Sequence, residues 1–158
     1  MPEAKPDFGE FSWHDCHIWA IAFQPGNPNQ GDWTSDLALD IDFICQWLCD
    51  DGGCRFRVAP AMLVFHDVSD ARIAIAWERT SYAHELSIAE IVREPLAADE
   101  TGLAQDKPSY RWIIKFNWPE GGELSFIASG FTQTLNAEPV LLDEQSFSLA
   151  TRNALLKR

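Results

Sequence analysis

The chain has 158 residues, of which 46% are hydrophobic, and this predicts one globular domain that buries its own core. Its 24 acidic and 12 basic residues give a net charge of −12, which disfavours binding to nucleic acid or to an anionic membrane surface. No apolar run approaches the ~20 residues of a membrane helix, and the acidic first residues do not resemble a secretory signal, so we expect a cytoplasmic protein.

Two strands are predicted in the first third of the chain. Residues 16–23 (CHIWAIAF) form the first, and the Pro-, Gly- and Asn-rich residues 24–33 form a long loop. Over residues 37–49 the apolar positions alternate, which is the period of a strand with one face in the core. That face comprises Leu37, Leu39, Ile41, Phe43, Cys45, Trp47 and Cys49. We expect Asp40 and Asp42 on the opposite face, in solvent, where a water-bridged cation is the alternative.

Three further strands are predicted in the middle of the chain. Residues 50–53 (DDGG) tolerate a tight reversal, so the chain should turn there into a strand that begins at Arg55. Pro60 cannot donate to a strand ladder and predicts an edge, a bulge or a bend. Residues 71–77 and 85–94 are two more short strands.

The last third contains the clearest hairpin. Residues 110–118 alternate large apolar with polar side chains, PEGG at 119–122 turns the chain, and residues 123–135 return. Before this hairpin, residues 95–109 are predicted to form a loop or a single helical turn. After it, residues 139–143 are a last strand.

These elements predict an all-β fold. We expect a single domain over residues 1–158 with about eight antiparallel strands, arranged as a sandwich or partly open barrel with at most short helices. The ends, about 1–7 and 150–158, should be flexible.

Two aromatic-His-Asp triplets carry the most chemistry, Trp13-His14-Asp15 and Phe65-His66-Asp67. If residues 14–19 are extended, His14 and His17 point to opposite faces and cannot ligate one ion without a bulge. We therefore assign no metal site, no cofactor and no catalytic residue. The remaining hypothesis is that His14 or His17 meets the second pair across neighbouring strands, each Asp orienting a His of the other pair. The alternative is that these side chains satisfy backbone groups at strand ends.

The four cysteines are expected to be free in a reducing compartment. Cys45 and Cys49 are interpreted as small core residues. Cys49 and Cys54 flank the DDGG turn, where a disulfide or a two-thiol metal clamp is geometrically feasible.

Several motifs resemble an uncharacterised bacterial family of small β-rich proteins. They are FSWHDCHI, the long alternating strand, VAPAMLVFHDV and NWPEGGELSFIASGFTQTL, within residues 8–145. The first motif and the late Gly-Phe segment are also similar to immunity proteins of bacterial toxin systems. That likeness implies a non-enzymatic protein that occludes a toxin's active site, and the acidic excess would suit a basic nuclease.

The sequence therefore favours a non-enzymatic cytoplasmic binding protein whose acidic or aromatic surface docks a basic protein partner. The alternative is a ligand-binding or hydrolytic β-barrel that uses His14 and His66 with nearby carboxylates. A homodimer through exposed strand edges is a third hypothesis. The predicted binding residues are His14, Asp15, His17, His66, Asp67, Trp112 and Trp118.

Overall fold

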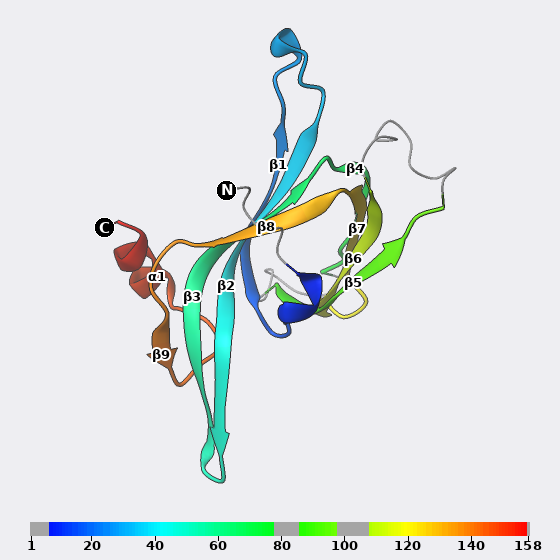
Figure 1. Ribbon diagram of the computed structural model, residues 1–158. Helices are drawn as coiled ribbons and strands as arrows, with labels where there is room; N and C mark the ends of the chain where they lie inside the picture. Colours follow the sequence, from blue (N-terminus) through cyan, green and yellow to red (C-terminus); the bar gives the residue numbers. More distant parts are fainter. Residues whose placement is uncertain (1–6, 78–85, 98–107, 158) are drawn as a thin grey trace.

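The computed structural model describes residues 7–77, 86–97 and 108–157, which form an antiparallel sheet of nine strands and one short α-helix (Figure 1). The predicted all-β class is confirmed. Most of the predicted loop at 95–109 lies outside the described residues. The strands are β1 (His17–Pro25), β2 (Ser35–Asp50), β3 (Gly53–His66), β4 (Ser69–Ala74), β5 (Ser87–Pro95), β6 (Tyr110–Trp118), β7 (Glu123–Ala128), β8 (Gly130–Leu135) and β9 (Val140–Leu142). Two 3-10 turns, η1 (Phe8–Glu10) and η2 (Pro28–Gln30), and α1 (Leu149–Leu156) complete the fold.

The sheet folds over on itself. Its strand order is β4-β7-β6-β5-β1-β2-β3-β8, with β9 also paired to β3. The pairing between β5 and β1 is short, and its register pair is His17↔Ser87. The half of the sheet that contains β3 faces the half that contains β6 and β7. The centroid of the Phe65 ring on β3 lies 5.0 Å from that of Trp112 on β6 and 4.7 Å from that of Phe126 on β7. Within the described residues, the outer strands β4 and β8 do not pair, so the sheet stays open.

The core follows the predicted alternation over the first half of β2. Leu37, Leu39 and Ile41 are fully buried, as predicted. The register between β2 and β3 shifts between Ile44 and Gln46, and beyond this bulge the hairpin extends away from the rest of the sheet (Figure 1). The alternation of residue types could not predict where the hairpin leaves the sheet, because a bulge changes the direction of the side chains without changing that alternation.

The interpretation of Cys45 and Cys49 as core residues is wrong for this reason. Both are exposed, as is Trp47, because they lie on the part of β2 that has left the core. Pro60, in contrast, does not interrupt its strand. It lies where the neighbour of β3 changes from β9 to β8, and its carbonyl accepts a hydrogen bond from Asn136 N (2.7 Å). Its missing N–H therefore falls at a gap between two ladders.

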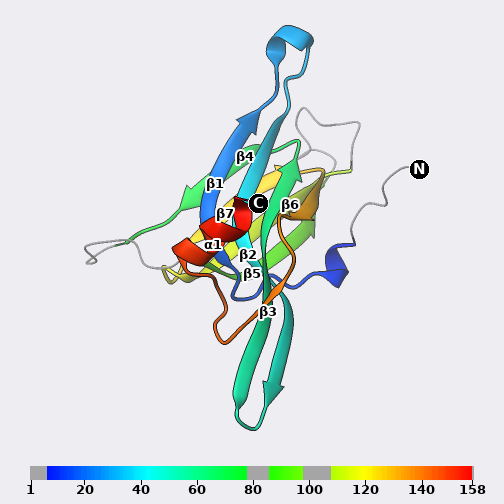
Figure 2. The same cartoon turned by 90° about the vertical axis from the view of Figure 1, so that its left-hand side faces the viewer.

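The C-terminal segment, which we predicted to be flexible, contains a helix. Residues Leu149–Leu156 form α1, which Ser148 caps by accepting from Thr151 N (3.2 Å). Of the predicted flexible residues 1–7, the structure describes Asp7, whose side chain caps η1. Figure 2 shows α1 (red) in front of β1 and β2. A helix in this place needs an attachment to the sheet.

That attachment is a buried ion pair. Arg152 of α1 donates from Nε to Asp42 Oδ1 (2.8 Å) and from Nη1 to Asp40 Oδ2 (3.1 Å), and Nη2 also pairs with Asp40. Phe147 N donates to Asp42 Oδ2 (2.9 Å), and the guanidinium lies 5.2 Å from the Trp19 ring. Asp42 is fully buried, so the prediction of a solvated Asp face is wrong for it. Charges are buried in this way when each has a partner.

No helix among the described residues has the length and apolar character needed to cross a membrane.

Candidate functional site

The first His-Asp pair lies in a turn and not in a strand. Cys16 N donates to Trp13 O (3.1 Å), and β1 begins only at His17. Asp15 occupies the left-handed region with φ 63°. The alternation of side chains that we assumed over residues 14–19 therefore starts three residues later than predicted.

Asp15 is held from two other elements. Its Oδ1 accepts from Asn117 Nδ2 (2.8 Å) at the end of β6, and its Oδ2 accepts from Gln145 Nε2 (2.9 Å). His14 Nδ1 lies 2.8 Å from the carbonyl oxygen of Ala89, and its Nε2 lies 3.5 Å from Asp15 Oδ1. The pair thus binds β5, β6 and the C-terminal segment to the turn. His14 meets a backbone carbonyl, as the alternative above expected, whereas Asp15 accepts from two side-chain amides.

The second pair lies at the end of β3. His66 Nδ1 is 3.2 Å from Asp36 Oδ2, and His66 Nε2 is 3.0 Å from Thr132 Oγ1. Asp67 Oδ2 accepts from Ser129 Oγ (2.6 Å), and Asp67 has φ 55°. The two triplets therefore share a backbone feature, since an Asp tolerates the left-handed conformation that each turn requires.

The two pairs do not converge. The His14 ring stacks on Trp47 with centroids 6.2 Å apart, whereas His66 is bound to Asp36. Trp47 and Asp36 are eleven residues apart on β2 (47 − 36), which corresponds to about 36 Å of strand. Neither Asp15 nor Asp67 orients the His of the other pair in this structure, because His14 and His66 each find partners on their own neighbouring strands.

Trp112 is not a surface residue. It is fully buried, and its Nε1 donates to Ala128 O (3.2 Å), so it offers no exposed surface to a partner or ligand. Phe116 on the same strand face is also buried. Trp118 at the end of β6 is 42% exposed. The apolar face of β6 is therefore core, except at its end.

A more exposed aromatic lies on the hairpin between β1 and β2. We define residues 23–36 as the β1–β2 arm; it projects from the sheet at the top of Figure 1. Trp33 is 81% exposed and Phe23 is 48% exposed. The sequence indicated a long loop here, and the Asp-Trp-Thr segment was the signal that went unused, since Asp followed by Thr two residues later forms a side-chain turn.

The loop that carries Trp33 is held by its own hydrogen bonds. Asp32 Oδ1 accepts from Thr34 N (3.0 Å) and Thr34 Oγ1 (2.6 Å). Gly26 N donates to Thr34 O (2.7 Å), and Asp32 N donates to Asn27 O (3.1 Å). Trp33 is thus exposed on a defined backbone and not on an unsupported chain.

The hairpin between β2 and β3 carries a disulfide at its tip. Cys49 and Cys54 face each other in the register and are bonded, whereas Cys16 and Cys45 are free thiols. The expectation of four free thiols is therefore wrong for this pair, and the disulfide is the geometric alternative that the DDGG turn allowed. Over residues 7–77, 86–97 and 108–157, no group of three or more His, Cys, Asp or Glu side chains is placed to hold a metal ion.

The two free thiols should differ in reactivity. Burial raises the pKa of the Cys16 thiol from 9.0 to about 12, although Ile44 N donates to its sulfur (3.5 Å). At pH 9 Cys16 therefore stays almost entirely a thiol and not the nucleophilic thiolate. Iodoacetamide should therefore label Cys45 in the folded protein and Cys16 only after unfolding, as peptide mass mapping would report. Labelling of both at one rate in the folded state would contradict this.

The raised pKa of Cys16 also has a consequence for stability. An unfolded Cys16 loses its proton near pH 9, whereas the folded one keeps it to about pH 12, so this group favours unfolding progressively as the pH rises through that window.

Comparisons with family models, with curated proteins and with solved structures find no match for this chain. The resemblances to a bacterial β-rich family and to immunity proteins stay predictions.

Proposed function

We propose that this protein is a non-enzymatic binding module that docks a basic protein partner through the β1–β2 arm. The observation that supports this is Trp33, which is 81% exposed on a loop ordered by its own hydrogen bonds. Asp32 and Asp36 are the charged residues of the arm, and no Lys or Arg occurs in the sequence between Lys5 and Arg55. The arm therefore combines a large apolar side chain with negative charge.

Each part of this arrangement has a role in association. A Trp that enters a partner's pocket contributes more binding energy than most interface side chains. A loop that is ordered before binding loses little conformational entropy on association. The one-signed charge accelerates encounter with a positively charged surface and disfavours acidic partners.

Two predictions from the sequence qualify this proposal. An immunity-type role would make the partner a basic toxin, for which the acidic excess is the support. A cytoplasmic location is in tension with the Cys49–Cys54 disulfide, since such bonds persist in oxidising compartments and are usually transient and redox-active in reducing ones.

A homodimer through the edge of β4 or β8 is a separate prediction that size measurement in solution decides.

Capture from lysate of the native cells tests the proposal. Three baits are compared: the wild-type protein, Trp33→Ala, and Leu149→Ala, which removes another exposed apolar side chain (59%) from α1. We expect a basic protein, identified by mass spectrometry, to be retained by wild type and Leu149→Ala and reduced about tenfold or more with Trp33→Ala. Equal retention by Trp33→Ala would refute the role of the arm.

One observation favours hydrolysis as a second candidate. Thr132, His66 and Asp36 form a chain of hydroxyl, imidazole and carboxylate, the order found in nucleophilic relays. However, His66 and Asp36 pair across β2 and β3, adjacent to the core pair Leu37↔Phe65, and so face away from the core.

The binding proposal predicts that the hydrogen-bonded series Thr132–His66–Asp36 has a structural role and no catalytic one. Wild type and His66→Ala should hydrolyse p-nitrophenyl acetate at the same slow rate, matched by His14→Ala as the control for an exposed imidazole. A loss of about 100-fold or more confined to His66→Ala would instead establish catalysis.

A further inference from the structure

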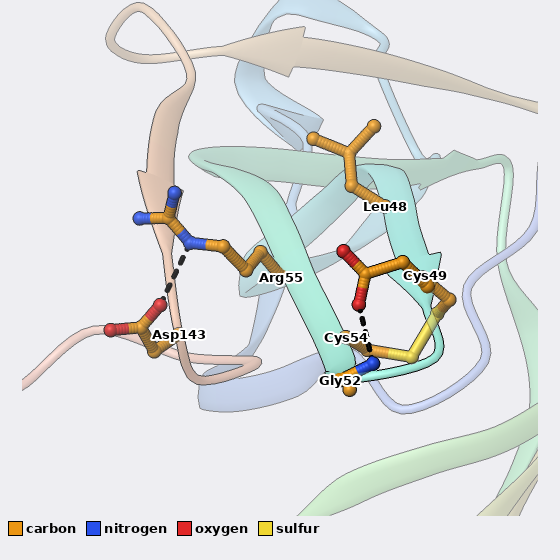
Figure 3. A pocket seen from close by; sticks show the side chains of 8 residues that line it. Leu48, Cys49, Gly52, Cys54, Arg55 and Asp143 are labelled. Carbon is orange, nitrogen blue, oxygen red and sulfur yellow. Dashed lines mark hydrogen bonds and ion pairs between the residues drawn. A yellow bond between two sulfur atoms is a disulfide. The ribbon is translucent and has the colours of Figure 1, made fainter.

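The tip of the β2–β3 hairpin exposes a disulfide beside a hollow (Figure 3). Cys49 and Cys54 are both exposed and join the ends of β2 and β3. The hollow has a volume of about 510 Å³ and includes both half-cystines in its lining. Its other lining residues are Leu48, Asp50, Gly52, Gly53, Arg55 and Asp143.

The hairpin does not need this bond for its register. The ladder pairs Leu48 with Arg55 on one side of the disulfide and Asp50 with Gly53 on the other. Asp50 Oδ1 also accepts from Gly52 N (2.8 Å), which closes the turn. A crosslink over so short a loop removes less entropy from the unfolded chain than one that closes a long loop. Exposed disulfides with small structural roles are the ones that exchange with thiols.

The charges around the disulfide are mostly negative. Asp50 is the last residue of β2 and Asp51 lies in the turn, both between the two cysteines, and Asp143 lines the hollow. Arg55 is the positive group of the hollow and is already paired, with its Nε donating to Asp143 Oδ1 (2.8 Å). Three carboxylates against one guanidinium leave a local charge of −2 (1 − 3). An attacking thiolate that carries further negative charge is repelled here, and one that carries an ammonium group is attracted.

We propose that Cys49–Cys54 is a thiol-exchange site selective for small cationic thiols, that is, aminothiols. The attacking thiolate forms a bond to one sulfur of the pair. The S–S bond breaks, and its electron pair leaves on the other sulfur, which takes a proton from water. A second reagent thiolate then attacks the reagent sulfur of the mixed disulfide. The bond to the protein sulfur breaks, its electron pair leaves on that sulfur, which takes a proton from water, and the reduced cysteine pair and the reagent disulfide are the products. Two electrons pass from two thiols to the protein disulfide.

The experiment measures reduction of the folded full-length chain, with Cys45→Ser as background so that the exposed free thiol does not interfere. The probes are cysteamine, 2-mercaptoethanol and 2-mercaptoethanesulfonate, and acid-quenched samples are analysed by mass spectrometry. Per unit of thiolate, we expect cysteamine to react about fivefold to tenfold faster than the sulfonate at low salt. In 1 M NaCl the ratio should fall to about twofold or less, because the Debye length shrinks to about 3 Å.

Matched variants assign this selectivity to the tip. The double variant Asp50→Asn, Asp51→Asn should lower the ratio of the cysteamine rate to the sulfonate rate. The double variant Glu120→Gln, Glu123→Gln, at the β6–β7 turn, should leave that ratio unchanged. Equal rates for the three thiols would overturn the charge selection, and reduction that occurs only in denaturant would overturn the exchange site. Trp33→Ala should exchange like wild type, so this inference and the binding proposal can fail separately.

Discussion

Replacing Arg152 with methionine should lower the free energy of unfolding by about 3–5 kcal/mol. The guanidinium is the partner of Asp42, which has no exposed surface, and it also pairs with Asp40. Methionine keeps much of the length of the side chain but leaves the buried carboxylate without a counter-charge. Because Arg152 holds α1 to β2, the helix should also detach and expose Trp19. Urea denaturation followed by tryptophan fluorescence measures the change.

Arg55→Met is the matched control for this prediction. Arg55 also forms an ion pair at 2.8 Å, with Asp143, but the two side chains are 54% and 83% exposed. An exposed pair of this kind contributes at most about 1 kcal/mol. If Arg152→Met cost no more than Arg55→Met, the ion pair under α1 would not be the attachment that we describe.

Trp33→Ala should weaken binding of the basic partner by about 2 kcal/mol or more, close to 30-fold in Kd. The same change should alter the free energy of unfolding by no more than about 0.5 kcal/mol, because the side chain is 81% exposed and packs little against the fold. Calorimetric titration with the partner recovered by capture measures the first quantity, and urea denaturation the second.

The two measurements together separate a binding role from a structural one. Leu149→Ala should change Kd by less than about threefold, since α1 lies away from the arm. A Trp33→Ala protein that loses stability as well as binding would indicate that the side chain supports the loop, and a protein that loses neither would indicate that the arm is not the interface.

The sequence predicted much of the sheet, because period-2 alternation and Gly-rich turns are local signals. It placed β2 and the DDGG hairpin correctly, and it recognised the core face as far as Ile41. It could not predict that β2 leaves the core after the bulge at Ile44, because that depends on which strands cover it. For the same reason Cys45 was assigned to the core.

The candidate sites depended more on tertiary structure. The burial of Asp42 requires a partner 110 residues later in the chain, which no local pattern announces. The two His-Asp triplets suggested one site, yet each belongs to a separate turn with its Asp at positive φ. Trp33 was passed over because loop composition indicates a turn but does not indicate which side chain the turn exposes.

Photo-crosslinking from the arm is the most direct measurement of the proposed function. A photoreactive phenylalanine analogue is placed at position 33, or at position 149 as the control, in the full-length protein in its native cells. If the β1–β2 arm is the interface, position 33 gives an adduct with one basic protein and position 149 does not. Adducts of equal yield from both positions, or none from position 33, would contradict it.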